Sequence, residues 1–369
     1  MVVPILPFVA LEFGASGFEL GALLTAYAGA QFAFAPVWGR LSDRVGRRPV
    51  LLLTIAGTAL SLALLGSSRS LAWMFVARLA GGAFAANLSV ASAYITDVTS
   101  EEERTRWMGL LGAAFGIGFT IGPAVGGALA PFGLSVPLLA AAGLAAANGV
   151  YAGLVLREPE ERVAPEGSEA RVRRWDLLRN PALRRLCVLY FVFSVAVTQL
   201  ETVFPFFMNA RFGYDASQVA VILVAMAVLM GGIQGGGMRA LSARFREPLL
   251  VGFGSLALGV AFLATLTAPT VAWLLAPLAL AAIGRAVAQP SLMSLASFAA
   301  PPAQRGIAMG TFQSSASLAR VVGPLLAGGL YDAWLGWPFA LAGALALAVG
   351  AIALFSPGAG TGPEQRGSR

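Results

Sequence analysis

The stretch Gly39-Arg40-Leu41-Ser42-Asp43-Arg44-Val45-Gly46-Arg47-Arg48-Pro49 decides the fold, because it is densely charged while the sequence on either side is apolar. Its four arginines and one aspartate cannot lie in hydrocarbon, where polar groups find no partners. We therefore expect a tight loop at a membrane face that joins two spanning helices. A short loop rich in arginine also predicts that this face is cytoplasmic.

The composition extends this reading to the whole chain. Of 369 residues, 57% are hydrophobic and only 12% are charged, about half the charge of a soluble domain. At about 20 residues per span, eleven or twelve helices and their loops account for nearly all of the sequence. The sequence therefore predicts an all-α integral membrane protein.

The net charge of +7 follows from the topology rather than from binding to nucleic acid. All 25 basic residues are arginines. The predicted topology places two of them outside (Arg69 and Arg211), three within spans (Arg78, Arg285 and Arg320) and the other 20 in cytoplasmic loops. This is the positive-inside bias of membrane proteins, so we expect no nucleic-acid partner.

Cysteine and histidine usage excludes several classes of chemistry. The chain has one cysteine, Cys187, and no histidine or lysine. A disulfide within the chain and a cysteine-based metal site are excluded, and we expect neither a metal nor a cofactor. A Walker sequence needs lysine, so ATP is not the driving force. A membrane enzyme is a weak alternative, because the commonest general base is missing.

Apolar runs predict twelve spanning helices, of which the first is incomplete. Residues 1–13 are too short to span a membrane, so either the true start lies upstream or this helix is a stub; no basic region precedes it to suggest a signal peptide. The other helices are expected at about residues 20–38, 50–66, 71–96, from near 104, 135–156, 186–208, 217–238, 249–266, 271–297, 305–330 and 337–355.

A charged, proline-containing segment divides these helices into two groups. Residues 157–185 are expected to form a cytoplasmic linker between an N-terminal six-helix bundle (1–156) and a C-terminal one (186–356). Within the linker, residues 175–178 are expected to form a short interfacial helix. Residues 357–369 are expected to form a polar cytoplasmic tail.

An internal duplication supports two parallel halves. Arg104, Gly109, Gly122-Pro123 and Gly127 match Arg305, Gly310, Gly323-Pro324 and Gly328 at a constant offset of 201 residues, and 41–44 matches 241–244 at an offset of 200. Such repeats predict a substrate site between the halves at mid-membrane. The second copy has Ala243 in place of Asp43, so its loop is expected to be structural only.

Three motifs resemble the major facilitator superfamily. The pattern G-x-x-x-D-R-x-G-R-R at 39–48 resembles the loop between its helices 2 and 3, and Arg78-Leu79-Ala80-Gly81-Gly82 resembles its helix 4 motif. The run 122–127 resembles the helix 5 signature of its drug:proton antiporter branch, which includes multidrug and tetracycline efflux. The motif residues are Gly118, Gly122, Pro123, Gly126 and Gly127; ordinary close helix packing is the alternative reading.

The resemblance assigns the charged loop to a conformational latch. It implies that Asp43 caps the helix beginning near 305 and pairs with Arg47 and Asp97, through bonds that break as the halves rock. A charge at a helix N-terminus contributes ~0.3–1 kcal/mol; a solvated loop charge is the alternative. The expected latch residues are Gly39, Asp43, Arg44, Gly46, Arg47, Arg48, Asp97 and Arg104.

Three charged residues within the spans are candidates for proton coupling. Glu201 is the only carboxylate well inside a predicted span, where burial suits proton uptake near neutral pH; a solvated position at the outer mouth is the alternative. Arg78 lies where the superfamily motif is implicated in proton transfer, with snorkelling as its alternative. Arg285, at mid-helix, is expected to line the cavity or pair with a carboxylate.

Polar and aromatic residues of the spans predict a cavity for an apolar or weakly polar ligand, cationic ones included. The expected lining residues are Tyr27, Gln31, Asn87, Gln199, Phe204, Phe207, Met208, Gln234, Gln289 and Gln313.

Together these features predict a secondary active transporter that works by alternating access and couples the efflux of drugs or other lipophilic compounds to protons. It is expected to be monomeric, in the cell membrane, with both termini cytoplasmic. A sugar or small-metabolite transporter of the same superfamily is the alternative, and a non-transporting membrane receptor is less consistent with the latch residues.

Overall fold

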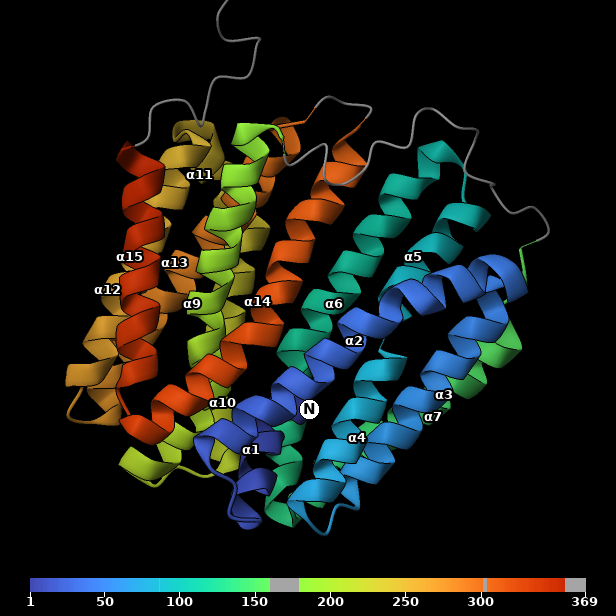
Figure 1. The fold of residues 1–369 in the computed structure, drawn as a ribbon, viewed down its shortest axis with the longest axis horizontal. Helices are drawn as coiled ribbons and strands as arrows, with labels where there is room; N and C mark the ends of the chain where they lie inside the picture. Colours follow the sequence, from blue (N-terminus) through green and yellow to red (C-terminus); the bar gives the residue numbers. More distant parts are fainter. Residues whose placement is uncertain (86, 160–178, 301–303, 356–369) are drawn as a thin grey trace, which may run out of the picture. The chain divides into compact units, whose positions relative to one another are not determined.

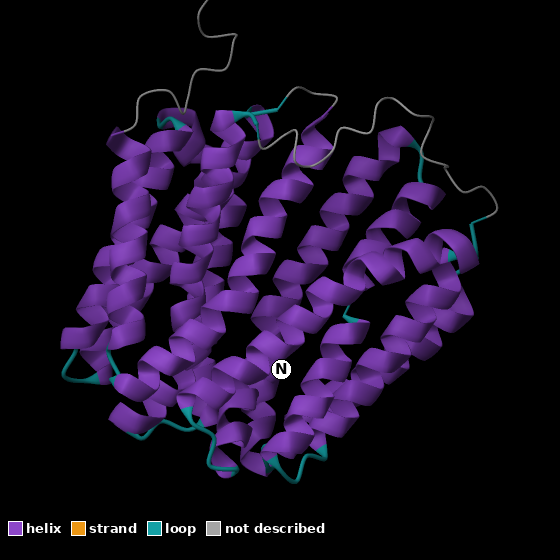
Figure 2. Ribbon diagram, in the orientation of Figure 1, coloured by secondary structure: helices purple, strands orange, loops and turns teal. Residues whose placement is uncertain are grey.

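The computed structural model describes residues 1–85, 87–159, 179–300 and 304–355. In these residues helices are joined by turns and loops, and no strand occurs (Figure 2). Ten helical segments of these residues are long and apolar enough to cross a membrane, with 71–98 and 216–244 each taken as one segment, which confirms the predicted all-α membrane class. Most of the predicted linker, including 175–178, and the tail lie outside the described residues.

Figure 1 shows the helices in chain order. They are α1 Val2–Glu12, α2 Gly17–Val45, α3 Arg47–Gly66, α4 Leu71–Phe84, α5 Asn87–Val98, α6 Glu101–Leu129, α7 Ser135–Val155, α9 Pro181–Phe212, α10 Ala216–Gly232, α11 Met238–Arg244, α12 Glu247–Thr267, α13 Val271–Phe298, α14 Arg305–Ala333 and α15 Trp337–Phe355. A 3₁₀ turn (Ala130–Phe132) follows α6, and a π-helical segment (Ile233–Gly237) joins α10 to α11.

The chain forms two compact units. The first comprises Met1–Glu169 and Met208–Val224, and the second comprises Ala170–Phe207 and Ala225–Arg369. Each therefore takes a short piece from the region of α9 and α10 in addition to one main segment. The two six-helix bundles expected from the sequence, 1–156 and 186–356, remain a prediction.

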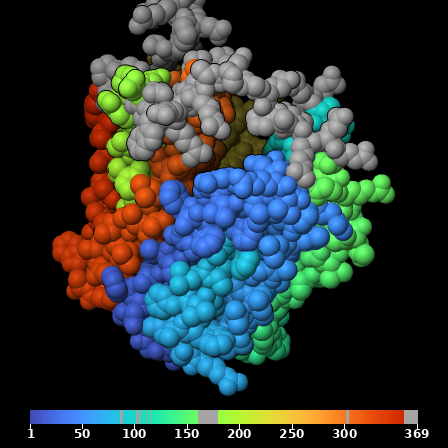
Figure 3. All heavy atoms as spheres, turned by 45° about the vertical axis from the view of Figure 1, so that its right-hand side comes forward, coloured from blue at the N-terminus to red at the C-terminus, as the bar shows by residue number. Residues whose placement is uncertain are grey.

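In the first unit, α3 packs against α4 and α7, and α2 packs against α4 (Figure 1). In Figure 3 the blue side chains of α2 to α4 form a continuous surface that borders the green side chains of α7. Large apolar side chains such as Phe132 and Leu154 are exposed. Such a surface is what contact with lipid requires.

In the second unit, α12 packs closely against α13 and α15. Gly254 and Gly284 make this approach possible, because a Cβ atom on Gly284 would lie 2.5 Å from the carbonyl oxygen of Gly254. Small residues at a helix contact let two backbones approach each other in a membrane. The pair α12 and α13 is thus held by backbone proximity as well as by side chains.

The predicted loop at 39–49 is wrong in its extent. Helix α2 continues to Val45 and α3 begins at Arg47, so Gly46 alone makes the turn, with φ at +125°. Only glycine adopts this backbone conformation readily. The charged residues therefore lie on the ends of helices, because a helix can continue beyond the hydrocarbon into the aqueous phase.

Two other helices depart from the predicted bounds. The span expected at 71–96 is interrupted after Phe84 and resumes at Asn87. The span expected to end at 238 continues through the π-helical segment to Arg244. Helix α6 begins at Glu101 rather than near Arg104. The Ser100 hydroxyl caps it by accepting a hydrogen bond from the backbone N–H of Glu103 at 3.4 Å.

Candidate functional site

Arg47 joins the two acidic residues of the predicted latch within the first unit. Its Nε atom donates to Asp97 Oδ2 at 2.8 Å, and one terminal nitrogen lies 2.5 Å from Asp43 Oδ1. The same terminal nitrogen donates to the buried Ser42 hydroxyl at 2.7 Å. Asp97 is buried, with a side chain 3% exposed, whereas that of Asp43 is 62% exposed. Arg47 therefore links α3 to the ends of α2 and α5.

Glu158, just beyond α7, is part of this cluster and was missed by the sequence analysis. Its two carboxylate oxygens accept hydrogen bonds from the backbone N–H groups of Arg47 and Arg48, at 2.7 and 2.9 Å. The available signal was that α3 begins with glycine and arginines and offers no side-chain cap of its own. The cap comes instead from Glu158, at the end of another helix.

Of the other predicted latch residues, Gly46 makes the turn just before Arg47 and Arg48 follows it, whereas Gly39 and Arg44 lie on α2. Gly39 is a helical residue with open space on its Cα, and Arg44 lies exposed in the last turn of α2. The side chain of Arg104 lies outside the described residues.

The glycines of the α6 motif serve helix packing in the first unit. A Cβ atom on Gly122 or Gly126 would lie 2.8 or 2.9 Å from the backbone of Met1, and one on Gly127 would meet Ala220. The carbonyl of Gly127 also accepts a hydrogen bond from the Ser217 hydroxyl at 2.9 Å. Gly118 has open space on its Cα, and Pro123 lies inside the helix. Close packing thus accounts for three of these residues.

Arg78 is held by an aromatic ring. Its guanidinium carbon lies 4.1 Å from the ring centroid of Tyr27, and its buried Nε atom has no hydrogen-bond partner among the described residues. A cation over an aromatic face is attracted to the ring, so Tyr27 offsets part of the cost of this charge. Nearby, the amide of Gln31 donates to the carbonyl of Ala85 at 3.1 Å, close to the break between α4 and α5.

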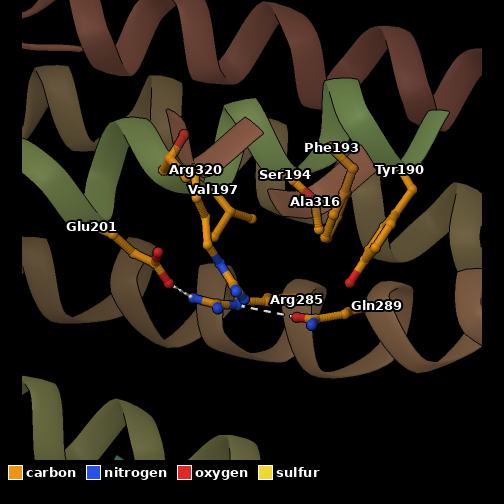
Figure 4. A pocket seen from close by; sticks show the side chains of 10 residues that line it. Tyr190, Phe193, Ser194, Val197, Glu201, Arg285, Gln289, Ala316 and Arg320 are labelled. Carbon is orange, nitrogen blue, oxygen red and sulfur yellow. Dashed lines mark hydrogen bonds and ion pairs between the residues drawn. The ribbon is translucent and has the colours of Figure 1, made fainter. Parts of the chain in front are cut away.

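The second unit contains a small cavity of about 30 Å³ at the meeting of α9, α13 and α14 (Figure 4). That volume has room for roughly two water molecules. The lining residues are Tyr190, Phe193, Ser194, Val197, Thr198, Glu201, Arg285, Gln289, Ala316 and Arg320.

Glu201 and Arg285 form an ion pair in this cavity. A terminal nitrogen of Arg285 lies 2.6 Å from Glu201 Oε1, and Arg285 Nε donates to Gln289 Oε1 at 3.4 Å (Figure 4). Arg285 is central in α13, about 20 Å from either helix end. Snorkelling does not reach that far, so the charge needs a partner. Arg285 therefore lines the cavity and pairs with a carboxylate.

The burial expected for Glu201 is not observed. Its side chain is 43% exposed, against 29% for Arg285. Glu201 lies on the face of α9 that lines the cavity. The proton-coupling role of Glu201 stays a prediction.

Arg320, predicted only to lie within a span, is a further residue of this cavity. It extends from the middle of α14 into the same cavity, toward Arg285 (Figure 4). No carboxylate of the described residues pairs with it within 4 Å. With Glu201 ionised, the cavity carries two positive charges and one negative charge, which does not favour a cationic ligand there.

Several predicted lining residues pack between helices instead. Gln199 is fully buried, and its amide donates to the carbonyl of Gly323 at 3.1 Å, so it joins α9 to α14. Phe204, Phe207 and Met208 are also buried. Residue type predicts a polar or aromatic lining, but it does not give the helix face on which a side chain lies.

The other predicted lining residues have different positions. Gln289 lines the cavity, Gln234 lies exposed in the π-helical segment, and Gln313 is exposed on α14. The side chain of Asn87 lies outside the described residues.

Comparison with known proteins gives the family. The family model described as Major Facilitator Superfamily matches residues 1–265 and 238–368. The chain is 34% identical over 335 residues to the class D tetracycline resistance protein of Salmonella ordonez, covering 88% of this chain and 84% of that protein. It is 28% identical to multidrug resistance protein 1 of Bacillus subtilis, covering 95% and 90%.

A solved structure is similar as well. The human organic anion transporter MFSD10 superposes with a TM-score of 0.65 at 30% identity, covering 90% of this chain and 83% of that one. The chain therefore belongs to the major facilitator superfamily and is a multi-pass membrane transporter of small molecules.

Proposed function

We propose that this protein exports lipophilic, drug-like compounds from the cell by alternating access, in exchange for protons. The tetracycline and multidrug resistance proteins among its relatives support this substrate class. We further propose that it works as a monomer in the plasma membrane, with both termini in the cytoplasm. The arginine-rich α2–α3 junction supports that orientation.

The observation that carries the proposal is the ion pair between Glu201 and Arg285. It joins α9 to α13 through a contact of 2.6 Å, within a membrane span. Protonation of Glu201 removes one charge and weakens the bond, and release of the proton restores it. The pair thus offers two arrangements of these helices that differ by one proton, which is what coupling requires.

The latch has a separate role in this proposal. Asp43, Arg47 and Asp97 join α2, α3 and α5 at one end of the first unit. We propose that their bonds stabilise one facing state and break in the other. A set of charge-assisted bonds at a helix end is suited to this, because each is strong enough to bias a state and weak enough to exchange.

A second candidate substrate class is lipophilic acids. Arg320, which pairs with no carboxylate of the described residues, favours this class, since two nearby cations with one carboxylate attract an anionic group. The cavity, of about 30 Å³, is too small for a whole drug. The relative MFSD10, described as an organic anion transporter, supports the same class.

The two classes differ in how substrate and proton affect each other. A cation held by the Glu201 carboxylate excludes a proton from it, so its affinity should rise with pH. An anion held by Arg320 favours the protonated form of Glu201, so its affinity should fall as pH rises. Titration of binding against pH therefore separates them.

The proposal is tested with purified protein in liposomes under an imposed pH gradient. A fluorescent lipophilic cation such as ethidium and the lipophilic acid 1-pyrenebutyrate are followed separately, together with internal pH. Movement of either probe coupled to opposite proton flow supports proton-driven export and identifies the class. Probe movement that is independent of the gradient would contradict it.

A further inference from the structure

We propose that Glu158 is a positioning residue of the latch. Together with Arg48 it forms a reciprocal clamp between the start of α3 and the end of α7, and the clamp holds Arg47 between Asp43 and Asp97. The consequence for transport rests on the proposed function, since it is through the latch that the clamp acts. The clamp itself rests on contacts within the first unit alone.

The first half of the clamp caps α3. The first N–H groups of a helix have no partner within it, and α3 has no side-chain cap of its own. Glu158 satisfies two of them, at Arg47 and Arg48, with one carboxylate oxygen each (2.7 and 2.9 Å). A negative charge at this end also opposes the positive end of the helix dipole.

The second half of the clamp caps α7. The last carbonyls of a helix also have no partner within it. Arg48 Nε donates to the carbonyl of Leu156 at 2.8 Å, and a terminal nitrogen donates to that of Gly153 at 2.7 Å. The carboxylate of Glu158, which follows α7, thus binds the start of α3, and the guanidinium of Arg48 on α3 binds the end of α7. Four hydrogen bonds connect the two helix ends.

Gly46 completes the clamp by leaving room for Glu158. A Cβ atom at position 46 would lie 2.6 Å from Glu158 Oε1. The glycine of the motif therefore has two reasons to be there, its positive φ and the approach of this carboxylate. The hydroxyl of Tyr94 adds a third helix, because it donates to the carbonyl of Arg157 at 2.9 Å.

The second half of the chain starts the equivalent helix with residues of a different kind. At an offset of 200 residues, Arg47 and Arg48 correspond to Glu247 and Pro248 at the start of α12. Glu247 supplies an acid within the first turn, and Pro248 has no N–H that needs a partner. The clamp is thus found beside Asp43, whereas the helix that follows Ala243 begins with an acid and a proline of its own.

Clamp and latch meet at one residue. The backbone N–H of Arg47 is bound by Glu158, while its side chain binds Asp43 and Asp97. Because Glu158 fixes the backbone of Arg47, less conformational entropy is lost when the Arg47 side chain forms its two ion pairs. Loss of Glu158 should therefore weaken the latch even though Glu158 touches neither aspartate.

The first test is hydrogen–deuterium exchange on the full-length protein in lipid nanodiscs. Glu158→Gln replaces one acceptor with a donor, so the amides at 47 and 48 should exchange about tenfold faster or more. The control Glu12→Gln changes an exposed acid at the end of α1 and should leave these amides unchanged. Unchanged exchange in Glu158→Gln would overturn the clamp.

The second test is a double-mutant cycle on the rate of gradient-driven transport. Glu158→Gln and Asp43→Asn should each lower the maximal rate about tenfold with KM within about twofold, and the double variant should be no slower than either. Glu158→Asp, which keeps the charge, should restore part of the rate. Multiplying effects in the double variant would overturn the positioning role, because they would mean independent contributions.

The two proposals fail in distinguishable ways. Wild-type protein that does not couple probe movement to protons contradicts the proposed function, while the exchange experiment still decides the clamp. Coupled transport in wild type, together with unchanged exchange in Glu158→Gln, contradicts the clamp and leaves the proposed function standing.

Discussion

Gly46 alone makes the turn between two long helices, α2 and α3. Its φ of +125° lies where residues with a side chain are strained, and its Cα faces the carboxylate of Glu158. The motif around it was recognised in the sequence. The acid 112 residues further along the chain was not, since a cap that comes from another helix end leaves no local pattern.

Gly46→Ala should destabilise the protein by ~1–3 kcal/mol, because alanine is strained at this φ and its Cβ meets Glu158. The matched control is Gly39→Ala, seven residues earlier in α2, where a Cβ meets nothing within 4 Å. Alanine there should be neutral or stabilising by up to ~1 kcal/mol. Thermal unfolding midpoints in detergent compare the two, and equal midpoints would contradict this account of Gly46.

Tyr27 should stabilise the protein through its ring rather than through its hydroxyl. Tyr27→Leu removes the aromatic face under Arg78 and should cost ~0.5–2 kcal/mol of stability, whereas Tyr27→Phe keeps that face and should be near neutral. The same unfolding assay measures both, with Tyr151→Leu at an exposed position of α7 as the control. A loss in Tyr27→Phe equal to that in Tyr27→Leu would assign the effect to the hydroxyl.

At the scale of elements, hydropathy predicted the existence of the helices better than their ends. Apolar runs place most spans within a few residues, because hydrocarbon forces every backbone group into a helix. Outside the hydrocarbon that constraint vanishes, and α2 and α11 continue to Val45 and Arg244. The π-helical segment was not predicted either, since its glycines read equally well as ordinary packing residues.

The contact between α9 and α14 depends on Gly323. A Cβ atom there would overlap the hydroxyl of Thr198, and the carbonyl of Gly323 accepts from the buried Gln199 amide. Gly323→Ala should therefore push the two helices apart and cost ~1–3 kcal/mol. The control Gly310→Ala, in the same helix with open space on its Cα, should cost little. A loss of stability of the same size in both variants would contradict the close contact.

At the scale of the molecule, the sequence predicted the all-α membrane class, the duplication and the family, because these follow from composition and from motifs at fixed spacing. It predicted the site only in part. Glu201, Arg285 and Gln289 were identified as charged or polar residues inside spans, and they meet in one cavity. Arg320 and the packing role of Gln199 required the helix faces, which the weakly amphipathic spans do not reveal.

The most direct test of the central claim is proton-driven probe transport by Glu201→Gln in liposomes, beside wild type and Glu12→Gln. Glutamine keeps the shape of the side chain and removes its proton and its charge. We predict that the variant binds the probe but loses at least about tenfold of the gradient-driven rate, while Glu12→Gln equals wild type. Unchanged gradient-driven transport by Glu201→Gln would contradict the assignment of proton coupling to the Glu201–Arg285 pair.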